Sequence, residues 1–162
     1  MVDDMQVRQV DFGATRDREA LVELLDLYAR DPMGGGEGLD PGVKARLCDD
    51  LAAMPGAVSF IAWRAGKPLG LLNAMPGYST FKARPLLNVH DIAVRSDCRG
   101  QGVGQALLAA LEAYARALGC CKLTLEVLSG NAVATRSYLR FGFEQYALDP
   151  AIGHAMFMQK WL

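Results

Sequence analysis

The chain has 162 residues, of which 51% are hydrophobic and 22% are charged, and its formal net charge is −1. This length suits one globular domain with a real core, and the charge lacks the basic excess typical of nucleic-acid-binding proteins. No apolar run approaches the ~18 residues of a membrane-spanning helix, and the N-terminus has early acids and no apolar signal segment. We therefore expect one cytoplasmic domain over residues 1–162, with neither nucleic acid nor membrane as a partner.

Hydrophobic periodicity predicts the elements of the first half of the chain. Alternation predicts a strand over residues 5–12, and an apolar helical face predicts a helix over residues 18–31, with Thr15 as its N-cap. A glycine-rich loop follows at residues 31–42. The next elements are a short helix over residues 43–54 and two hairpin strands over 57–64 and 68–75.

The second half begins with a predicted loop, residues 76–86, that is rich in aromatic side chains. The elements expected after it are a strand over 87–94, a helix over 103–118, a strand over 120–128, a helix over 131–141, and final strands over 142–148 and 154–162. Strands joined by hairpins and crossover helices indicate a mixed α/β, or α+β, domain.

The most informative stretch is DCRGQGVG, residues 97–104, at the start of an amphipathic helix. Gly100, Gly102 and Gly104 lie where the first backbone N–H groups of a helix have no intrahelical partner. These groups and the helix dipole can bind an anion, and Arg99 can add a charged donor. The alternative is a turn whose glycines serve only its geometry. A P-loop is excluded, because no Lys and Ser or Thr follow the last glycine.

The same stretch resembles the R/Q-x-x-G-x-G/A motif of the GCN5-related N-acetyltransferases (GNATs), through Arg99, Gly102 and Gly104. The resemblance continues through the family pattern N-x-x-A-x-x-x-Y-x-x-x-GF, which is matched by Asn131, Ala134, Tyr138, Gly142 and Phe143. Together the matched segments cover residues 88–143 in the family's order and spacing.

Membership of this family implies a central, mostly antiparallel mixed sheet of about seven strands, splayed at strands 4 and 5 and flanked by about four helices. It implies acetyl-CoA as the co-substrate, with its pyrophosphate at the glycine turn and its pantetheine arm along the fourth strand. The implied cofactor-binding residues are Ile92, Ala93, Val94, Arg99, Gly100, Gln101, Gly102, Val103, Gly104, Gln105, Asn131, Ala134 and Tyr138. No metal is expected, and the four cysteines show no metal-ligand spacing.

Acetyl transfer to an amine needs a proton donor for the leaving thiolate and a route for the amine proton. Tyr138 is the expected acid, because it shares a helical face with Asn131 and Ala134; the alternative is a tyrosine that only packs. The expected base is His90, since regular alternation would put it on one face with Ile92. A histidine bonded within the sheet is the alternative, and Glu126 or water would then be the base.

The acceptor is expected to bind between the loop at 31–42 and the loop at 76–86. The candidate side chains for a cationic, partly apolar amine are Asp31, Glu37, Asp40, Tyr78 and Phe81, although the acids could simply be solvated. The glycines at 34–36 suggest a mobile lid or an ordinary loop. Cys120 and Cys121 are expected to pack in a strand and not to carry an acyl group.

The sequence thus predicts an acetyl-CoA-dependent N-acetyltransferase that acts directly, in a ternary complex, on a primary amine of a small molecule. The alternatives are a protein or peptide acetyltransferase and a non-catalytic acyl-CoA sensor. The last two predicted strands carry more apolar side chains than one sheet face needs, which suggests a homodimer through residues 143–161.

Overall fold

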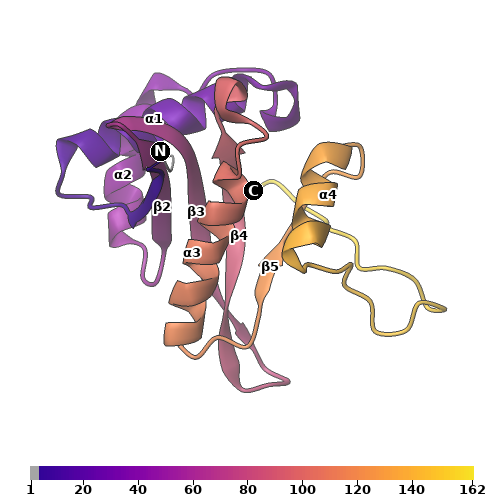
Figure 1. The fold of residues 1–162 in the computed structure, drawn as a ribbon. Coiled ribbons are helices and arrows are strands. Elements are labelled where there is room, and N and C mark those ends of the chain that lie inside the picture. The colour runs from indigo at the N-terminus through magenta and orange to yellow at the C-terminus, as the bar shows by residue number, and fades with distance from the viewer. Residues whose placement is uncertain (1–3) are drawn as a thin grey trace. The chain divides into compact units, whose positions relative to one another are not determined.

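A computed structural model describes residues 4–162, so the first three residues of the expected domain lie outside the described part (Figure 1). The chain divides into two compact units, residues 1–125 and residues 126–162. The first unit contains the sheet, and the second contains one helix and a long segment without strands.

The sheet of the first unit has five strands in the order β1-β2-β3-β4-β5. All neighbours are antiparallel except β4 and β5, which are parallel. The mixed α+β class and the mostly antiparallel sheet are therefore confirmed. The strands are β1 (Gln6–Gln9), β2 (Val58–Arg64), β3 (Lys67–Ser79), β4 (Arg84–Val94) and β5 (Leu123–Leu125).

Helices cover both faces of this sheet. On one face, α1 (Thr15–Arg30) and α2 (Pro41–Ala53) pack on a buried cluster that includes Ile61 and Leu71. On the other face lies α3 (Val103–Ala117), whose Tyr114 meets the edge of Phe60 with ring centroids 5.9 Å apart. Phe60 and Ile61 are consecutive on β2 and so point to opposite faces.

Gly70 lets α3 lie close to the sheet. A Cβ atom at this position would be 2.7 Å from the carbonyl oxygen of Ala93 and 3.1 Å from Cγ1 of Val103. Both distances are shorter than normal contacts between non-bonded atoms, which for carbon are about 3.5–4.0 Å. The start of α3 therefore approaches β3 as closely as a bare backbone allows.

The first two helices begin differently from the prediction. Ala14 is the N-cap of α1, without a side-chain cap, so Thr15 was wrongly predicted. Instead the buried Asp17 accepts a hydrogen bond from the N–H of Asp11 at 3.0 Å, which satisfies a donor of the preceding turn. Asp40 caps α2 and Pro41 begins it, an arrangement that suits proline because the first helical N–H needs no partner.

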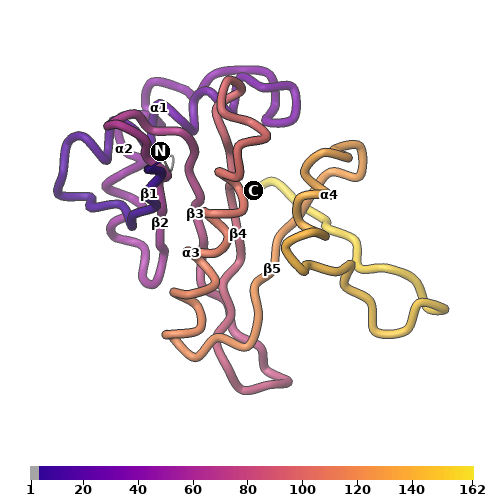
Figure 2. The backbone as a smooth tube through the Cα atoms, viewed as in Figure 1, coloured from indigo at the N-terminus to yellow at the C-terminus, as the bar shows by residue number. Residues whose placement is uncertain are grey.

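Most of the predicted loop at 76–86 is strand, and only residues 80–83 connect β3 to β4. Figure 2 shows this long hairpin. The prediction failed because Pro76 and Gly77 normally interrupt strands. Beyond Ala74, however, β3 has no partner on β2, and a proline is tolerated where the missing N–H would face no neighbouring strand.

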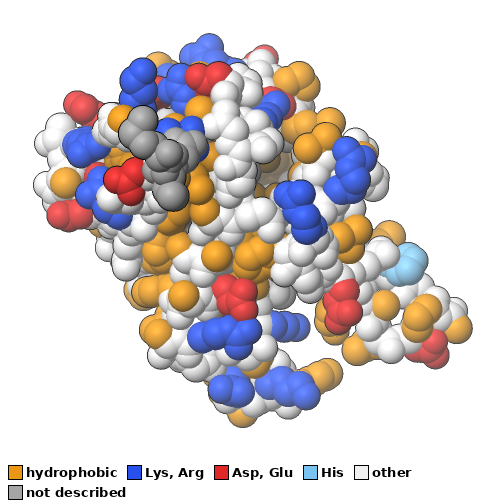
Figure 3. All heavy atoms as spheres, viewed as in Figure 1, with side chains coloured by type: hydrophobic (Ala, Val, Ile, Leu, Met, Phe, Trp, Pro, Cys, Tyr) orange, Lys and Arg blue, Asp and Glu red, His pale blue; other side chains and the backbone are white. Residues whose placement is uncertain are grey.

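The second unit contains α4 (Ala132–Phe141), and residues 142–162 form no strand. The predicted strands at 142–148 and 154–162 were wrong, and the sheet has five strands and not about seven. Apolar residues become a strand only where a sheet edge pairs with them, and β5 is only three residues long. Large apolar side chains of this segment are exposed, among them Phe157 and Trp161. Figure 3 shows hydrophobic side chains on the surface of the molecule.

Candidate active site

The glycine turn follows β4 and begins α3. Gly100 and Gly102 have positive φ angles of 75° and 80°, and Gly102 is the N-cap. The first helical hydrogen bond runs from Ala106 to the carbonyl of Gly102, which leaves the earlier N–H groups without an intrahelical acceptor. A Cβ atom at Gly100 or Gly102 would meet no described atom within 4 Å. The turn thus combines N–H groups without helical acceptors with open space where side chains would stand, a combination that suits a phosphate.

Two side chains of the turn already have partners within the first unit. Nη2 of Arg99 lies 2.9 Å from Oδ2 of Asp31, which follows α1. Gln101 donates to the carbonyl of Asp97 at 3.2 Å and accepts from Nη1 of Arg64 at 2.7 Å. Arg99 has further N–H groups for a phosphate, whereas both ends of the Gln101 amide are occupied by protein.

The fourth strand has an open edge beside this turn. β5 pairs only with residues 87–89 of β4, so within residues 4–125 the stretch 90–94 has strand neighbours on the β3 side alone. Ile92, Ala93 and Val94 lie on this stretch and are half-buried. Their outward N–H and C=O groups can pair with an extended ligand as an added strand would.

A β-bulge changes the expected alternation on β4. Asp91 pairs with Asn73 and Val89 pairs with Ala74, so His90 is an extra, exposed residue without a partner in the register. The predicted common face of His90 and Ile92 assumed an unbroken strand. Bulges occur often near active sites because they redirect side chains.

Asp91 is the residue that sequence reasoning missed, because the search for a base considered only the face of Ile92, and Asp91 pairs with Asn73 on the opposite face. In the structure it is half-buried on the α1 face, and its Oδ2 accepts from Nδ2 of Asn73 at 3.0 Å. Tyr28, in the last turn of α1, lies near it: burial raises the pKa of the Tyr28 phenol, and the charges of Asp91 and Asp31 raise it further. The aspartate next to a histidine was visible in the sequence, but the bulge was not.

The loop after α1 is fastened at several points. Asp31 caps a short 3₁₀ turn through Met33 N–H as well as binding Arg99, and these hydrogen bonds lower the pKa of its carboxyl. Asp40 accepts from Gly42 N–H as the cap of α2. Two of the three acids proposed for the acceptor therefore have structural partners.

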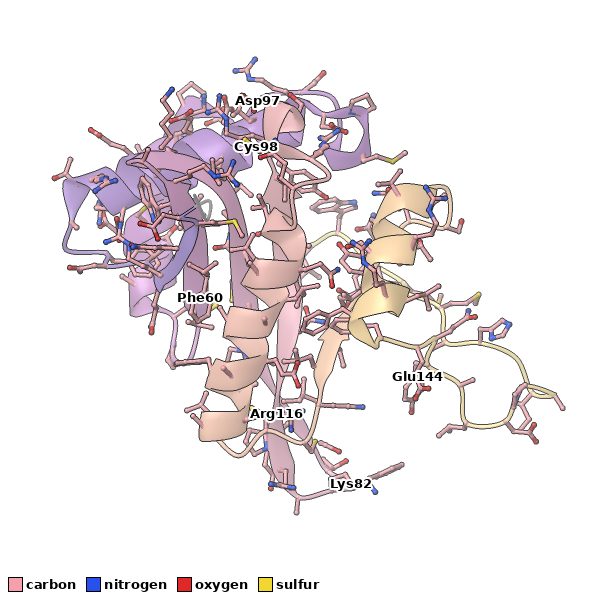
Figure 4. The ribbon with its side chains drawn as sticks, viewed as in Figure 1. Phe60, Lys82, Asp97, Cys98, Arg116 and Glu144 are labelled. Carbon is pink, nitrogen blue, oxygen red and sulfur yellow. The ribbon has the colours of Figure 1, made fainter. Side chains whose placement is uncertain are left out.

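Tyr78 and Phe81 belong to the other end of the first unit. They lie at or near the tip of the β3–β4 hairpin and are 62% and 91% exposed. From Arg84 to Val94, β4 makes ten steps, about 33 Å. Figure 4 shows Asp97 beside the start of α3 and Lys82 at the far end. The two predicted acceptor loops therefore do not form one pocket.

In the second unit, α4 carries the other predicted residues. Oδ1 of Asn131 accepts from the N–H of Ala134 at 3.1 Å and caps the helix, which explains this spacing in physical terms. Tyr138 is half-buried and meets the edge of Phe143 with centroids 6.1 Å apart. Gly142, with φ of 111°, ends the helix.

The cysteines are free thiols, and burial raises the pKa values of Cys48, Cys98 and Cys120. A raised pKa reduces the thiolate fraction and hence the nucleophilicity. Over residues 4–162, no three His, Cys, Asp or Glu side chains gather as metal ligands would. In the same range no helix has both the length and the apolar character to cross a bilayer.

Residues 21–143 match the family model described as the acetyltransferase (GNAT) family. The chain is 34% identical over 119 residues to streptothricin acetyltransferase of Streptomyces lavendulae, across 74% of this chain and 57% of that protein. It is 38% identical over 73 residues to an L-methionine sulfoximine/L-methionine sulfone acetyltransferase of Pseudomonas aeruginosa, across 45% of this chain and 41% of that protein. The chain thus spans about half the length of these curated relatives.

Solved structures show the same fold. A probable acetyltransferase superposes with a TM-score of 0.80 at 18% identity, over 96% of this chain and 99% of that one. AAC(6')-Iy in complex with a bisubstrate analogue superposes with a TM-score of 0.76 at 20% identity, over 98% and 99%. With the glycine turn, the open edge of β4 and the match over residues 21–143, the chain belongs to the acetyltransferase (GNAT) family.

Proposed function

We propose that this protein transfers the acetyl group of acetyl-CoA to a primary amine of a small molecule, within a ternary complex. The observation that carries the proposal is the turn of Gly100 and Gly102 in a GNAT-family chain: side chains there would enter open space, and the N–H groups before Ala106 have no helical acceptor. In this proposal the turn binds the pyrophosphate together with Arg99 and the backbone of Val103, Gly104 and Gln105.

The pantetheine arm then pairs with the edge of β4 at Ile92, Ala93 and Val94. The amine nitrogen bonds to the thioester carbonyl carbon, the carbon–sulfur bond breaks, the nitrogen loses one proton and the leaving sulfur gains one. Tyr138 supplies the proton to sulfur, and Asn131 and Ala134 shape the α4 surface beside the ligand. The products are an N-acetylated amine and free CoA.

His90 is the proposed proton acceptor, with Glu126 or water as the alternatives. Exposure of His90 at the bulge supports access to solvent, and histidine is a common general base in enzymes. Direct transfer is supported by the raised pKa values of Cys98 and Cys120, which disfavour an acyl-cysteine intermediate.

The two units are proposed to work as one catalytic domain, because the family match at residues 21–143 includes parts of both. A homodimer is proposed through the exposed apolar residues of the last segment, including Met156, Phe157 and Trp161. Light scattering should give the mass of two chains, and a mass of one chain would remove this part of the proposal.

A small-molecule acceptor is supported by the named substrates of the relatives: streptothricin, methionine sulfoximine and methionine sulfone. The test is thiol release from acetyl-CoA with a panel of streptothricin, sisomicin, methionine sulfoximine and a lysine peptide, with products identified by mass spectrometry. Acetylation of a small amine supports the proposal. Acetylation of the peptide alone would favour a protein acetyltransferase, and acetyl-CoA binding without turnover would favour a sensor.

A further inference from the structure

We infer that Asp91 is the anchor for a cationic acceptor amine, and that Asn73 and Ser59 are positioning residues that hold its carboxylate. This rests on the proposed function for its place in catalysis. The binding of a cation is a separate property that can be measured without turnover.

The first observation is a chain of polar groups that crosses three strands. The hydroxyl of Ser59 on β2 donates to Oδ1 of Asn73 on β3 at 2.6 Å, and Nδ2 of Asn73 donates to Oδ2 of Asp91 on β4 at 3.0 Å. Ser59 and Asn73 are 3% and 1% exposed, whereas Asp91 is half-buried. This series of hydrogen bonds thus runs from the core outward and ends on the carboxylate of Asp91.

Burying such a series of polar side chains in the middle of a sheet costs free energy. Polar groups removed from water need every hydrogen bond to be made, and apolar side chains of similar size would stabilise a core at least as well. The neighbours of Asn73 along β3, Leu72 and Ala74, are fully buried apolar residues. The hydrogen bond from the buried Ser59 fixes the direction of the Asn73 amide. The amide N–H of Asn73 in turn holds the carboxylate of Asp91.

The second observation is the charge around Asp91. Among residues 4–162, the Oδ1 atom of Asp91 makes no hydrogen bond and the carboxylate forms no ion pair. The charges of Asp91 and Asp31 act on the phenol of Tyr28 of α1, and His90 directly precedes Asp91 in the chain. Asp31 has Arg99 as its cation, whereas Asp91 has none. A half-buried carboxylate without a counter-charge is a ready partner for an ammonium group.

The third observation is the position on β4. Asp91 directly follows the bulge, at the inner end of the open edge 90–94. It is three steps, about 10 Å, from Val94, where β4 ends before the glycine turn. A ligand that binds at the turn and pairs along this edge ends beside Asp91. The ligand class that this carboxylate selects is an aliphatic amine, which is positively charged at neutral pH, over neutral arylamines and alcohols.

The first test measures binding without turnover. In protein labelled with carbon-13 at aspartate carboxyl groups, the Asp91 signal should shift saturably with n-butylammonium and not with 1-butanol, which has nearly the same shape without the charge. The signal of Asp17, a buried aspartate at the start of α1, should shift with neither. An Asp91 signal that does not respond to n-butylammonium would overturn the inference, whatever the outcome of the acetylation panel.

The second measurement uses variants and sisomicin as the acceptor. Asp91→Asn should raise KM for sisomicin about 10- to 100-fold, the range for a hydrogen bond to a charged group, while the affinity for acetyl-CoA stays the same. The matched control Asp17→Asn alters a buried aspartate outside the site and should leave KM unchanged. Equal KM values for Asp91→Asn and wild type would overturn the inference even if the enzyme acetylates sisomicin.

The positioning role has its own readout. Asn73→Leu removes the donor that holds Oδ2 of Asp91, so the n-butylammonium concentration that half-saturates the shift of the Asp91 carbon-13 signal should rise about threefold to tenfold. Ser59→Ala should raise KM about threefold to tenfold with little change in kcat, and Ser59→Thr, which keeps the hydroxyl, should restore most of it. An unchanged n-butylammonium affinity in folded Asn73→Leu would show that these hydrogen bonds serve only stability.

Discussion

The two units use their apolar side chains in different ways. The first unit buries large side chains such as Leu21, Leu71 and Leu111 completely, between helices and a five-stranded sheet. In the second unit no residue from 126 to 162 is buried, although the segment is rich in apolar residues. The difference teaches that hydrophobic content alone gives a core only where strands and helices offer each other complementary faces.

The residues proposed for the site follow the same division. In the first unit they are fixed by contacts with neighbouring elements, such as Asn73 with Asp91 and Asp31 with Arg99. In the second unit, Asn131 caps α4 by accepting from the N–H of Ala134, and the ring of Tyr138 meets that of Phe143. Four predictions test this contrast.

The largest effect is expected in the core of the first unit. Leu71→Ala should lower the free energy of unfolding by about 2–5 kcal/mol, because it removes a fully buried side chain and leaves a cavity. Trp161→Ala removes a larger side chain that is 87% exposed, and should change stability by less than about 0.5 kcal/mol. Chemical denaturation measures both, and an equal loss for Trp161→Ala would contradict the contrast.

Tyr138→Phe tests whether the second unit takes part in chemistry. It keeps the ring contact with Phe143 and removes the proton, so kcat should fall about 100-fold or more, equivalent to about 2.7 kcal/mol. Acetyl-CoA affinity should change little. Tyr146→Phe, in the same unit but outside the proposed site, is the control. A chemistry-limited rate close to wild type would show that Tyr138 only packs.

Gly102→Val tests the turn, with Gly119→Val as its matched control. Both glycines have positive φ, 80° and 75°, and open space around the missing Cβ, so both variants carry the same backbone strain. Only Gly102→Val should weaken acetyl-CoA binding, at least tenfold or about 1.4 kcal/mol. Equal calorimetric affinities for the two variants would defeat the phosphate-binding role.

The smallest effect concerns Asp26, which fastens the loop after α1. Hydrogen bonds from Lys44, the Leu39 N–H and Arg30 lower its pKa to about 2. Since the folded pKa lies below the unfolded value of about 4, its stabilisation is complete above pH 4 and is lost as the pH falls toward 2. Asp26→Asn should flatten the acid limb of the stability curve. Asp50→Asn, an exposed control, should leave that limb unchanged.

Much of the fold could be predicted from the sequence pattern, because α1 and α3 each bury an apolar face and β2 and β3 contain runs of buried residues. The helix over 103–118 was predicted nearly at its observed bounds, and the hairpin at 57–75 was predicted correctly except that β3 continues to Ser79. The strands at 142–148 and 154–162 could not be predicted correctly. Their alternation is real, but strand formation depends on a free sheet edge, which no local pattern encodes.

The parts of the site that depend on backbone conformation could be predicted from the sequence. The parts that depend on the register between β3 and β4 could not. Glycines just before a helix predict a turn with positive φ angles, and Gly102 indeed has a conformation that other residues rarely adopt. The bulge at His90 was not predictable, so the predicted common face of His90 and Ile92 assumed a regular strand. Asp91 was missed because its hydrogen bond to Asn73 depends on the register between β3 and β4, which the local sequence does not encode.

Gly70 has a consequence for how this scaffold can change over time. It has no ionisable group, touches no proposed ligand and belongs to no motif, yet the added methyl group of an alanine there would push on Ala93 and Val103. Val103 begins α3 directly after the glycine turn, so the push would lift the turn from the strand beside it. A mutational library of this protein should therefore find position 70 among its least tolerant, although nothing in its chemistry would have drawn attention to it.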